Sequence, residues 1–92
     1  MITVTIHAFA KYRELFGEET KVEVPEEATV YDALIIFAGM RMKAQTELFD
    51  GASLKSHVVL MYNRERIDAD DAAVITLEDG DEVVLYPPVS GG

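Results

Sequence analysis

The chain has 92 residues, no cysteine, and 8 Lys and Arg against 17 Asp and Glu, which gives a formal charge of −9. This length is typical of one small domain, and we expect residues 1–92 to form it. The missing cysteines exclude disulfides, thiolate zinc sites, cysteine-ligated iron–sulfur clusters and thiol nucleophiles. The acidic balance argues against direct binding of nucleic acid or of an anionic membrane surface.

Neither a signal peptide nor an apolar run long enough to cross a membrane is visible, so we expect a soluble, cytoplasmic protein. The negative charge has two interpretations, which are solubility and attraction to a basic partner surface. Both also apply to the segment 68–82, which contains no Lys or Arg. Its acidic residues are Asp68, Asp70, Asp71, Glu78, Asp79, Asp81 and Glu82.

Two strands begin the chain. Residues 2–9 alternate apolar and polar side chains, which predicts a half-buried strand. Residues 20–24 alternate in the same way and end at Pro25, which cannot continue a central strand. The connection between them contains Gly17, and we expect a β-hairpin with a long connection.

A helix follows. Thr29 and Asp32 have the spacing of an N-terminal capping pair, with Asp in place of the usual Glu or Gln. Apolar residues then recur at helical spacing, at Val30, Ala33, Leu34, Phe37 and Ala38. Ile35 and Ile36 widen this apolar surface, so we expect the helix to be buried on more than one side. Gly39 either ends the helix or weakens it.

The second half of the chain predicts short elements. Residues 41–49 could continue as helix, with a turn at Asp50-Gly51, but the segment 40–56 stays open. Five features follow: a buried strand at 58–62, a polar turn at 63–66 with a short edge strand from Ile67, a helical turn at 70–73, a tight turn at 79–81 and a last strand at 82–86. This order predicts an α+β domain of β-grasp type, in which a mixed sheet of four to five strands packs on one main helix. The first and last strands would then pair in parallel at its centre.

The most informative segment is the extended tail formed by residues 87–92. Pro87 and Pro88 stiffen the exit from the last strand, and Gly91 and Gly92 leave the tip without side chains. Such a tip could enter a narrow channel and present the α-carboxylate of Gly92, which requires activation before it can transfer an acyl group. The alternative is a frayed terminus without function.

Side chains for catalysis are not evident. His7 lies on a predicted strand among apolar residues, and Ser56 and His57 are adjacent on the chain, so they would point in opposite directions. No phosphate-binding glycine loop or metal-ligand spacing occurs, so we expect no cofactor and no metal bound by this chain. Lys11, Lys21, Lys43 and Lys55 are interpreted as solubilising surface residues, with a role as isopeptide acceptors left open.

The segment LEDGDEVVLYPPVSGG, residues 77–92, resembles the C-terminal signature of the MoaD/ThiS family of ubiquitin-like sulfur carriers. Residues 9–17, 28–37 and 63–65 also resemble the family's first hairpin, helix start and central hairpin, in the right order. The resemblance implies a β-grasp fold and similarity to the small subunits of molybdopterin synthases.

The resemblance also implies a chemistry. A ubiquitin-activating-type enzyme would use its own Mg-ATP to adenylate Gly92, and a sulfur donor enzyme would convert the adenylate to a thiocarboxylate. The sulfur would pass to a pterin precursor on the large subunit of molybdopterin synthase. Gly92 would carry the sulfur and Gly91 would let it reach the active site, while Pro87, Pro88, Val89 and Ser90 would form the rest of the inserted tail. The chain would be a carrier rather than a stand-alone catalyst.

Three alternatives remain open. The chain could be a ubiquitin-like modifier that forms isopeptide bonds between Gly92 and lysines of other proteins. It could supply sulfur for tRNA thiolation, with an enzyme rather than the carrier contacting the RNA. It could also be a non-reactive β-grasp interaction domain whose tail has no role.

Overall fold

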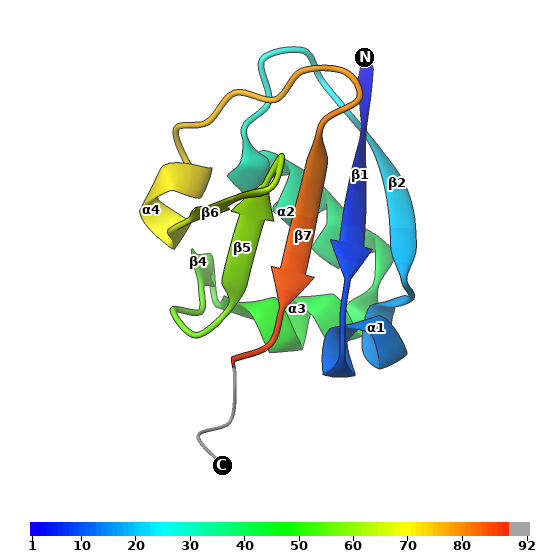
Figure 1. Cartoon of the computed structure of the whole chain (residues 1–92), viewed down its shortest axis with the longest axis vertical. Coiled ribbons are helices and arrows are strands. Elements are labelled where there is room, and N and C mark those ends of the chain that lie inside the picture. Colours follow the sequence, from blue (N-terminus) through cyan, green and yellow to red (C-terminus); the bar gives the residue numbers. More distant parts are fainter. Residues whose placement is uncertain (89–92) are drawn as a thin grey trace.

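The computed structural model describes residues 1–88, and its main feature is a five-stranded mixed sheet in the order β2–β1–β7–β5–β6 (Figure 1). The strands of this sheet are β1 (Ile2–Ala8), β2 (Glu19–Val24), β5 (Val59–Tyr62), β6 (Glu65–Ile67) and β7 (Glu82–Tyr86). The helices are α1 (Lys11–Phe16), α2 (Val30–Met40), α3 (Met42–Leu48) and α4 (Ala69–Ala72). A separate two-stranded ribbon consists of β3 (Phe49–Asp50) and β4 (Ser53–Leu54).

The first and last strands lie side by side within the sheet, as the sequence predicts. β1 pairs in parallel with β7 and antiparallel with β2, so its backbone is hydrogen-bonded on both sides. Val4, Ile6 and Ala8 of β1 are buried, which confirms the period-2 pattern. The predicted long connection between β1 and β2 contains the short helix α1, which the sequence pattern did not predict. The expectation of an α+β, β-grasp domain with a five-stranded sheet is therefore confirmed.

The main helix, α2, is held at its start by the predicted cap. Thr29 Oγ1 accepts a hydrogen bond from the Asp32 N–H (3.1 Å), and Asp32 Oδ2 accepts one from the Thr29 N–H (2.9 Å). The residues of the predicted stripe are all buried against the sheet. The expectation that Ile35 and Ile36 widen the buried surface of α2 holds for Ile36, which is half-buried against the core, and is wrong for Ile35, which is 41% exposed. With only one sheet to cover, the helix has a single core face and turns Ile35 toward solvent.

The structure defines the segment 40–56, which the sequence did not assign to one kind of element. α2 continues through Gly39 to Met40, and Arg41 then takes an extended conformation that separates α2 from α3. The predicted turn at Asp50-Gly51 joins β3 to β4, and Gly51 has a positive φ of 64°. Local propensity alone could not separate one bent helix from two helices.

Two expectations for the region 58–67 require correction. Leu60 is buried, but Val59 and Met61 are only half-buried, because no helix within residues 1–88 covers the second face of the sheet. The polar turn is also shorter than expected, since Asn63 and Arg64 alone connect β5 to β6. None of the helices within residues 1–88 is long and apolar enough to span a membrane.

Candidate functional site

The C-terminal segment leaves the domain from a strand that is paired on both sides. β7 is flanked by β1 and β5, and the chain passes from Tyr86 to half-buried Pro87 and exposed Pro88 at the end of the sheet far from the N-terminus (Figure 1). The other predicted tail residues, Val89, Ser90, Gly91 and Gly92, lie outside the described residues. The tail thus begins at a strand that is hydrogen-bonded to a neighbouring strand on each side.

The aromatic side chains of Phe9 and Tyr86 pack together where β7 leads into the tail. The Phe9 N–H donates a hydrogen bond to the Leu85 carbonyl oxygen (3.1 Å), which extends the pairing between β1 and β7 by one residue. The Phe9 and Tyr86 rings stack, with their centroids 4.9 Å apart and their planes inclined by 10°. Because Tyr86 directly precedes Pro87, this aromatic contact lies next to the point where the chain leaves the sheet.

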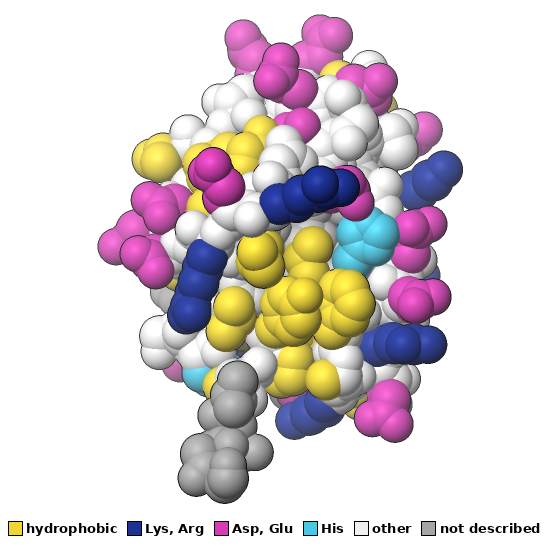
Figure 2. Space-filling view, in the orientation of Figure 1, with side chains coloured by type: hydrophobic (Ala, Val, Ile, Leu, Met, Phe, Trp, Pro, Cys, Tyr) yellow, Lys and Arg dark blue, Asp and Glu magenta, His cyan; other side chains and the backbone are white. Residues whose placement is uncertain are grey.

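Phe9 and Tyr86 belong to an apolar surface on the uncovered side of the sheet. Val83 and Leu85 point into the core, so Val84 and Tyr86 point outward, and the register places Met61 beside Val84 and Val59 beside Tyr86. We call Phe9, Val59, Met61, Val84 and Tyr86 the open-face patch. Figure 2 shows it as a continuous apolar area above the start of the tail. Contiguous exposed apolar surfaces of this kind commonly mark interaction sites.

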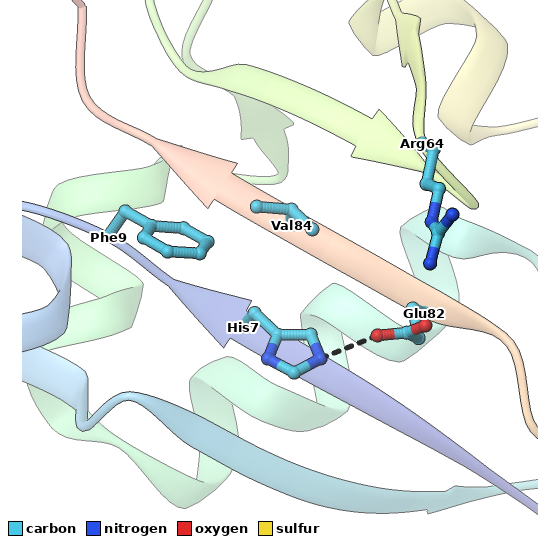
Figure 3. Close-up of a pocket in the computed structure, with 5 residues that line it drawn as sticks. All are labelled: His7, Phe9, Arg64, Glu82 and Val84. Atoms are coloured by element: carbon cyan, nitrogen blue, oxygen red, sulfur yellow. Dashed lines mark hydrogen bonds and ion pairs between the residues drawn. The ribbon is translucent and has the colours of Figure 1, made fainter.

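One end of the open-face patch is hollowed. His7, Phe9, Arg64, Glu82 and Val84 line an open depression of about 220 Å³ (Figure 3). His7 Nε2 lies 2.8 Å from Glu82 Oε2, and because a carboxylate only accepts, this nitrogen donates the hydrogen bond. The depression thus combines an apolar floor with the hydrogen-bonded pair His7 and Glu82 and with the side chain of Arg64.

The turn that carries Arg64 is anchored to the sheet. Asn63 donates its backbone N–H to the Glu82 carbonyl oxygen (3.0 Å) and accepts the Glu82 N–H on Oδ1 (2.9 Å). Its side-chain Nδ2 donates to Asp81 Oδ1 (3.0 Å). Asn63 and Arg64 have φ values of 44° and 75°, as required at both central residues of a tight hairpin turn of type I′.

Asp81 is the centre of this anchor. Its carboxylate also accepts hydrogen bonds from the Tyr62 hydroxyl (2.6 Å) and the Glu78 N–H (2.8 Å). Burial raises the pKa of Asp81, but the hydrogen bonds from Tyr62, Asn63 and Glu78 lower the pKa by more, and the net pKa lies below its usual value. The hydrogen bond to Asp81, aided by burial and nearby negative charge, raises the pKa of Tyr62 to about 12.

The acidic segment 68–82 has more than one role. Asp68 and Asp71 form a capping box at α4, and Asp79 Oδ1 accepts the Thr3 N–H at 2.8 Å. Asp81 is only 9% exposed. Neither solvation nor docking therefore describes the whole segment, because three of its acids satisfy backbone groups of the fold and a fourth is buried.

Of the remaining candidates, only His7 borders the open-face patch. His7 is half-buried, whereas His57 is exposed in the turn before β5. Lys11 pairs with Glu47 (3.1 Å), and Lys55 donates to the Thr46 carbonyl oxygen (2.7 Å). Within residues 1–88, no group of three or more His, Asp or Glu is placed to hold a metal ion.

The open-face patch was not predicted from the sequence, although two apolar runs indicate it. The runs VVLMY and EVVLY are apolar at consecutive positions, whereas a strand with one wet face normally alternates. We interpreted the first run as fully buried. The same run also fits a strand with one apolar face left uncovered. Only the positions of the helices distinguish the two interpretations.

Comparisons with known proteins agree with this geometry. The model of the ThiS family matches residues 6–92. Small archaeal modifier protein 1 of Haloferax volcanii is 36% identical over 86 residues, with 91% of this chain and 94% of that protein covered. The molybdopterin synthase sulfur carrier subunit of Drosophila erecta is 31% identical over 93 residues, with 100% and 93% covered. The crystal structure of the Haloferax volcanii modifier superposes with a TM-score of 0.85 at 30% identity, covering 97% of this chain and 100% of that one. The five-stranded β-grasp fold, the strand that leads into a C-terminal diglycine and these matches place the chain in the ThiS family of ubiquitin-like proteins.

Proposed function

We propose that this protein is a sulfur carrier that donates sulfur for molybdopterin biosynthesis from a thiocarboxylate at Gly92. The observation that carries the proposal is the family match over residues 6–92, which includes the diglycine following β7. The molybdopterin synthase sulfur carrier subunits align over the whole chain and support the same function. The absence of cysteine from the sequence agrees with sulfur held on a carboxyl carbon rather than on a thiol.

The proposed cycle needs three partner proteins. In an adenylating enzyme of ubiquitin-activating type, a carboxylate oxygen of Gly92 attacks the α-phosphorus of Mg-ATP and pyrophosphate leaves. A donor at the sulfide level then attacks the acyl carbon and AMP leaves, so the C–O bond is replaced by a C–S bond. On the large subunit of molybdopterin synthase, the thiocarboxylate sulfur bonds to a carbon of the pterin precursor. Water then attacks the acyl carbon of Gly92, the C–S bond to the carrier breaks, the sulfur stays on the precursor and the carboxylate is restored.

This chain contributes recognition and presentation rather than catalysis. Mg-ATP belongs to the adenylating enzyme, and the carrier binds no cofactor of its own in this proposal. The stacking of Phe9 on Tyr86 at the exit and the small residues Gly91 and Gly92 suit a tail that enters a partner's active site. We place this cycle in the cytoplasm, where ATP is available for activation.

Mass spectrometry of the intact chain tests the proposal. Incubation with the adenylating enzyme of the same organism, Mg-ATP and sulfide should add the mass difference between sulfur and oxygen at Gly92. A chain lacking Gly92 is the matched control and should gain nothing. An unchanged mass in the full chain, under conditions in which the enzyme thiocarboxylates another carrier, would contradict the proposed function.

A second candidate function has its own observation. The 36% identical relative is named a small archaeal modifier protein, which favours isopeptide formation between Gly92 and lysines of other proteins. Proteomic detection of such Gly92–lysine adducts in cells would support this role. A complete absence of adducts in cells that contain the thiocarboxylate would favour the carrier role alone.

A further inference from the structure

A second hollow lies where α4 and the β3–β4 ribbon approach the start of α2, on the side of the molecule at which β5 and β6 form the edge of the sheet (Figure 1). The hollow is open to solvent and has a volume of about 280 Å³. None of the five residues of the open-face patch lines it. It is therefore a separate surface feature, which the proposed sulfur transfer does not use.

The walls of this hollow are mostly apolar, and three of them are alanines, whose short side chains leave the space open. These wall residues are Ala52, Leu54, Ala69 and Ala73. Half-buried Tyr31 also lines the hollow, and its hydroxyl donates a hydrogen bond to the Ala52 carbonyl oxygen. The Tyr31 ring meets the Phe49 ring at 75°, with the centroids 6.0 Å apart. The tyrosine is thus held in place at both its ring and its hydroxyl.

Backbone hydrogen bonds hold the three elements together. The Val30 N–H donates to the Ile75 carbonyl oxygen (3.1 Å), which joins the segment after α4 to the start of α2. Asp68 and Asp71 form the capping box of α4. The hollow is therefore formed before any ligand arrives, and a preformed site avoids part of the entropic cost of binding.

Asp70 gives the hollow a negative charge. Its neighbours on α4, Asp68 and Asp71, are occupied by backbone N–H groups in the capping box. Asp70 is exposed, and in the described part of the chain it takes no part in an ion pair. The segment 68–82 around it contains no Lys or Arg. Acids without an interspersed base create a local potential that attracts cations.

These features match the chemistry of one class of side chain. Lysine and arginine carry an apolar stem, which can lie along the alanines, and a cationic head that stays near water. A cation is attracted both to a carboxylate such as Asp70 and to an aromatic ring such as that of Tyr31. An acidic side chain would be repelled at this place, and an uncharged one would gain neither attraction.

We propose that this hollow binds a lysine or arginine side chain of a partner protein, with the stem against Ala69 and Ala73 and the head at Asp70 and Tyr31. The site goes beyond the proposed function, because binding here requires no reaction at Gly92. A partner bound in the hollow leaves β7 and the start of the tail accessible. One protein can therefore hold the chain while another acts on Gly92.

Nuclear magnetic resonance of the isotope-labelled full chain tests the proposal with the end-capped tripeptides Gly-Lys-Gly and Gly-Arg-Gly. Both peptides should shift the amide resonances of Ala52, Ala69 and Ala73 as their concentration rises. The same tripeptide with norleucine, which keeps an apolar stem but has no charge, should bind at least about fivefold more weakly. Equal binding of the norleucine peptide, or no shift of these amides with either basic peptide, would overturn the proposal.

Variants of the chain separate a local site from general attraction to an acidic protein. Asp70→Asn removes one exposed charge and should weaken binding of the lysine peptide about fivefold. Glu14→Gln is the matched control, since it removes one exposed charge on α1, away from the hollow, and it should leave binding unchanged. Ala69→Leu fills the hollow without altering the charge and should abolish the shifts. Equal weakening by Asp70→Asn and Glu14→Gln, or full binding to Ala69→Leu, would contradict a site in this hollow.

Discussion

Replacing Asp81 with Ala tests whether one carboxylate holds the β5–β6 turn against β7. The substitution removes the acceptor of three hydrogen bonds, from Tyr62 (2.6 Å), Asn63 (3.0 Å) and the Glu78 N–H (2.8 Å). At about 1 kcal/mol each, the typical net contribution of a hydrogen bond to stability, the loss is about 3 kcal/mol. This is a large part of the stability expected for so small a domain.

Urea unfolding at neutral pH, followed by circular dichroism, measures this loss. The urea concentration at the midpoint of unfolding should be lower for the Asp81→Ala variant than for the wild type. The slope of the unfolding free energy against urea concentration should stay constant. Asp70→Ala is the matched control, since Asp70 is exposed on α4, and its free energy of unfolding should change by less than about 0.5 kcal/mol. A loss below about 1 kcal/mol for Asp81→Ala would refute the assignment of Asp81 as the anchor.

The pH dependence of the stability difference between the wild type and Asp81→Ala gives a second test. The folded pKa of Asp81 is lowered, so its contribution is fully present above the unfolded value of about 3.9. The contribution is lost as the pH falls through the folded pKa. The difference between wild type and Asp81→Ala should therefore shrink in acid. A difference that is constant from neutral pH down to about pH 2 would contradict the proposed network.

Three further outcomes can be measured with the same unfolding assay. The Tyr62 pKa is raised to about 12, so the advantage of the wild type over Tyr62→Phe should be full below about pH 10 and decline as the pH rises toward that value. An advantage that grows in alkali would contradict the hydrogen bond to Asp81. Thr29→Ala removes the Oγ1 acceptor of the Asp32 N–H and should cost about 1 kcal/mol, whereas no loss would show that the cap is dispensable. Leu34→Ala opens a cavity under α2 at a fully buried position and should cost about 2–5 kcal/mol, and a loss below about 1 kcal/mol would mean that the core collapses around it.

The local elements of this fold follow from short stretches of sequence. The alternation in residues 2–8 predicts which side chains of β1 enter the core, and the structure buries Val4, Ile6 and Ala8. The pair Thr29 and Asp32 likewise predicts the start of α2 to the residue. These predictions succeed because the interactions that decide them span only a few residues.

The candidate site is also predictable from the sequence only in part. A tail that begins at Pro87 after a last strand is evident from the order of residues, because prolines end pairing and glycines leave no side chain. The open-face patch is not evident, since an apolar run such as residues 58–62 reads alike whether one face or both faces are covered. Which faces of the sheet receive a helix depends on contacts between segments far apart in the chain.

The sequence by itself determined a β-grasp order of elements, a core of alternating side chains and a diglycine end. Only the tertiary structure decided which apolar residues remain outside. It exposes Ile35 because α2 has one sheet to cover, and it buries Asp81 because the β5–β6 turn meets the start of β7 there. It also places Arg64 and Arg66 beside Met61 and Val84, a position set by strand pairing rather than by neighbours in the chain.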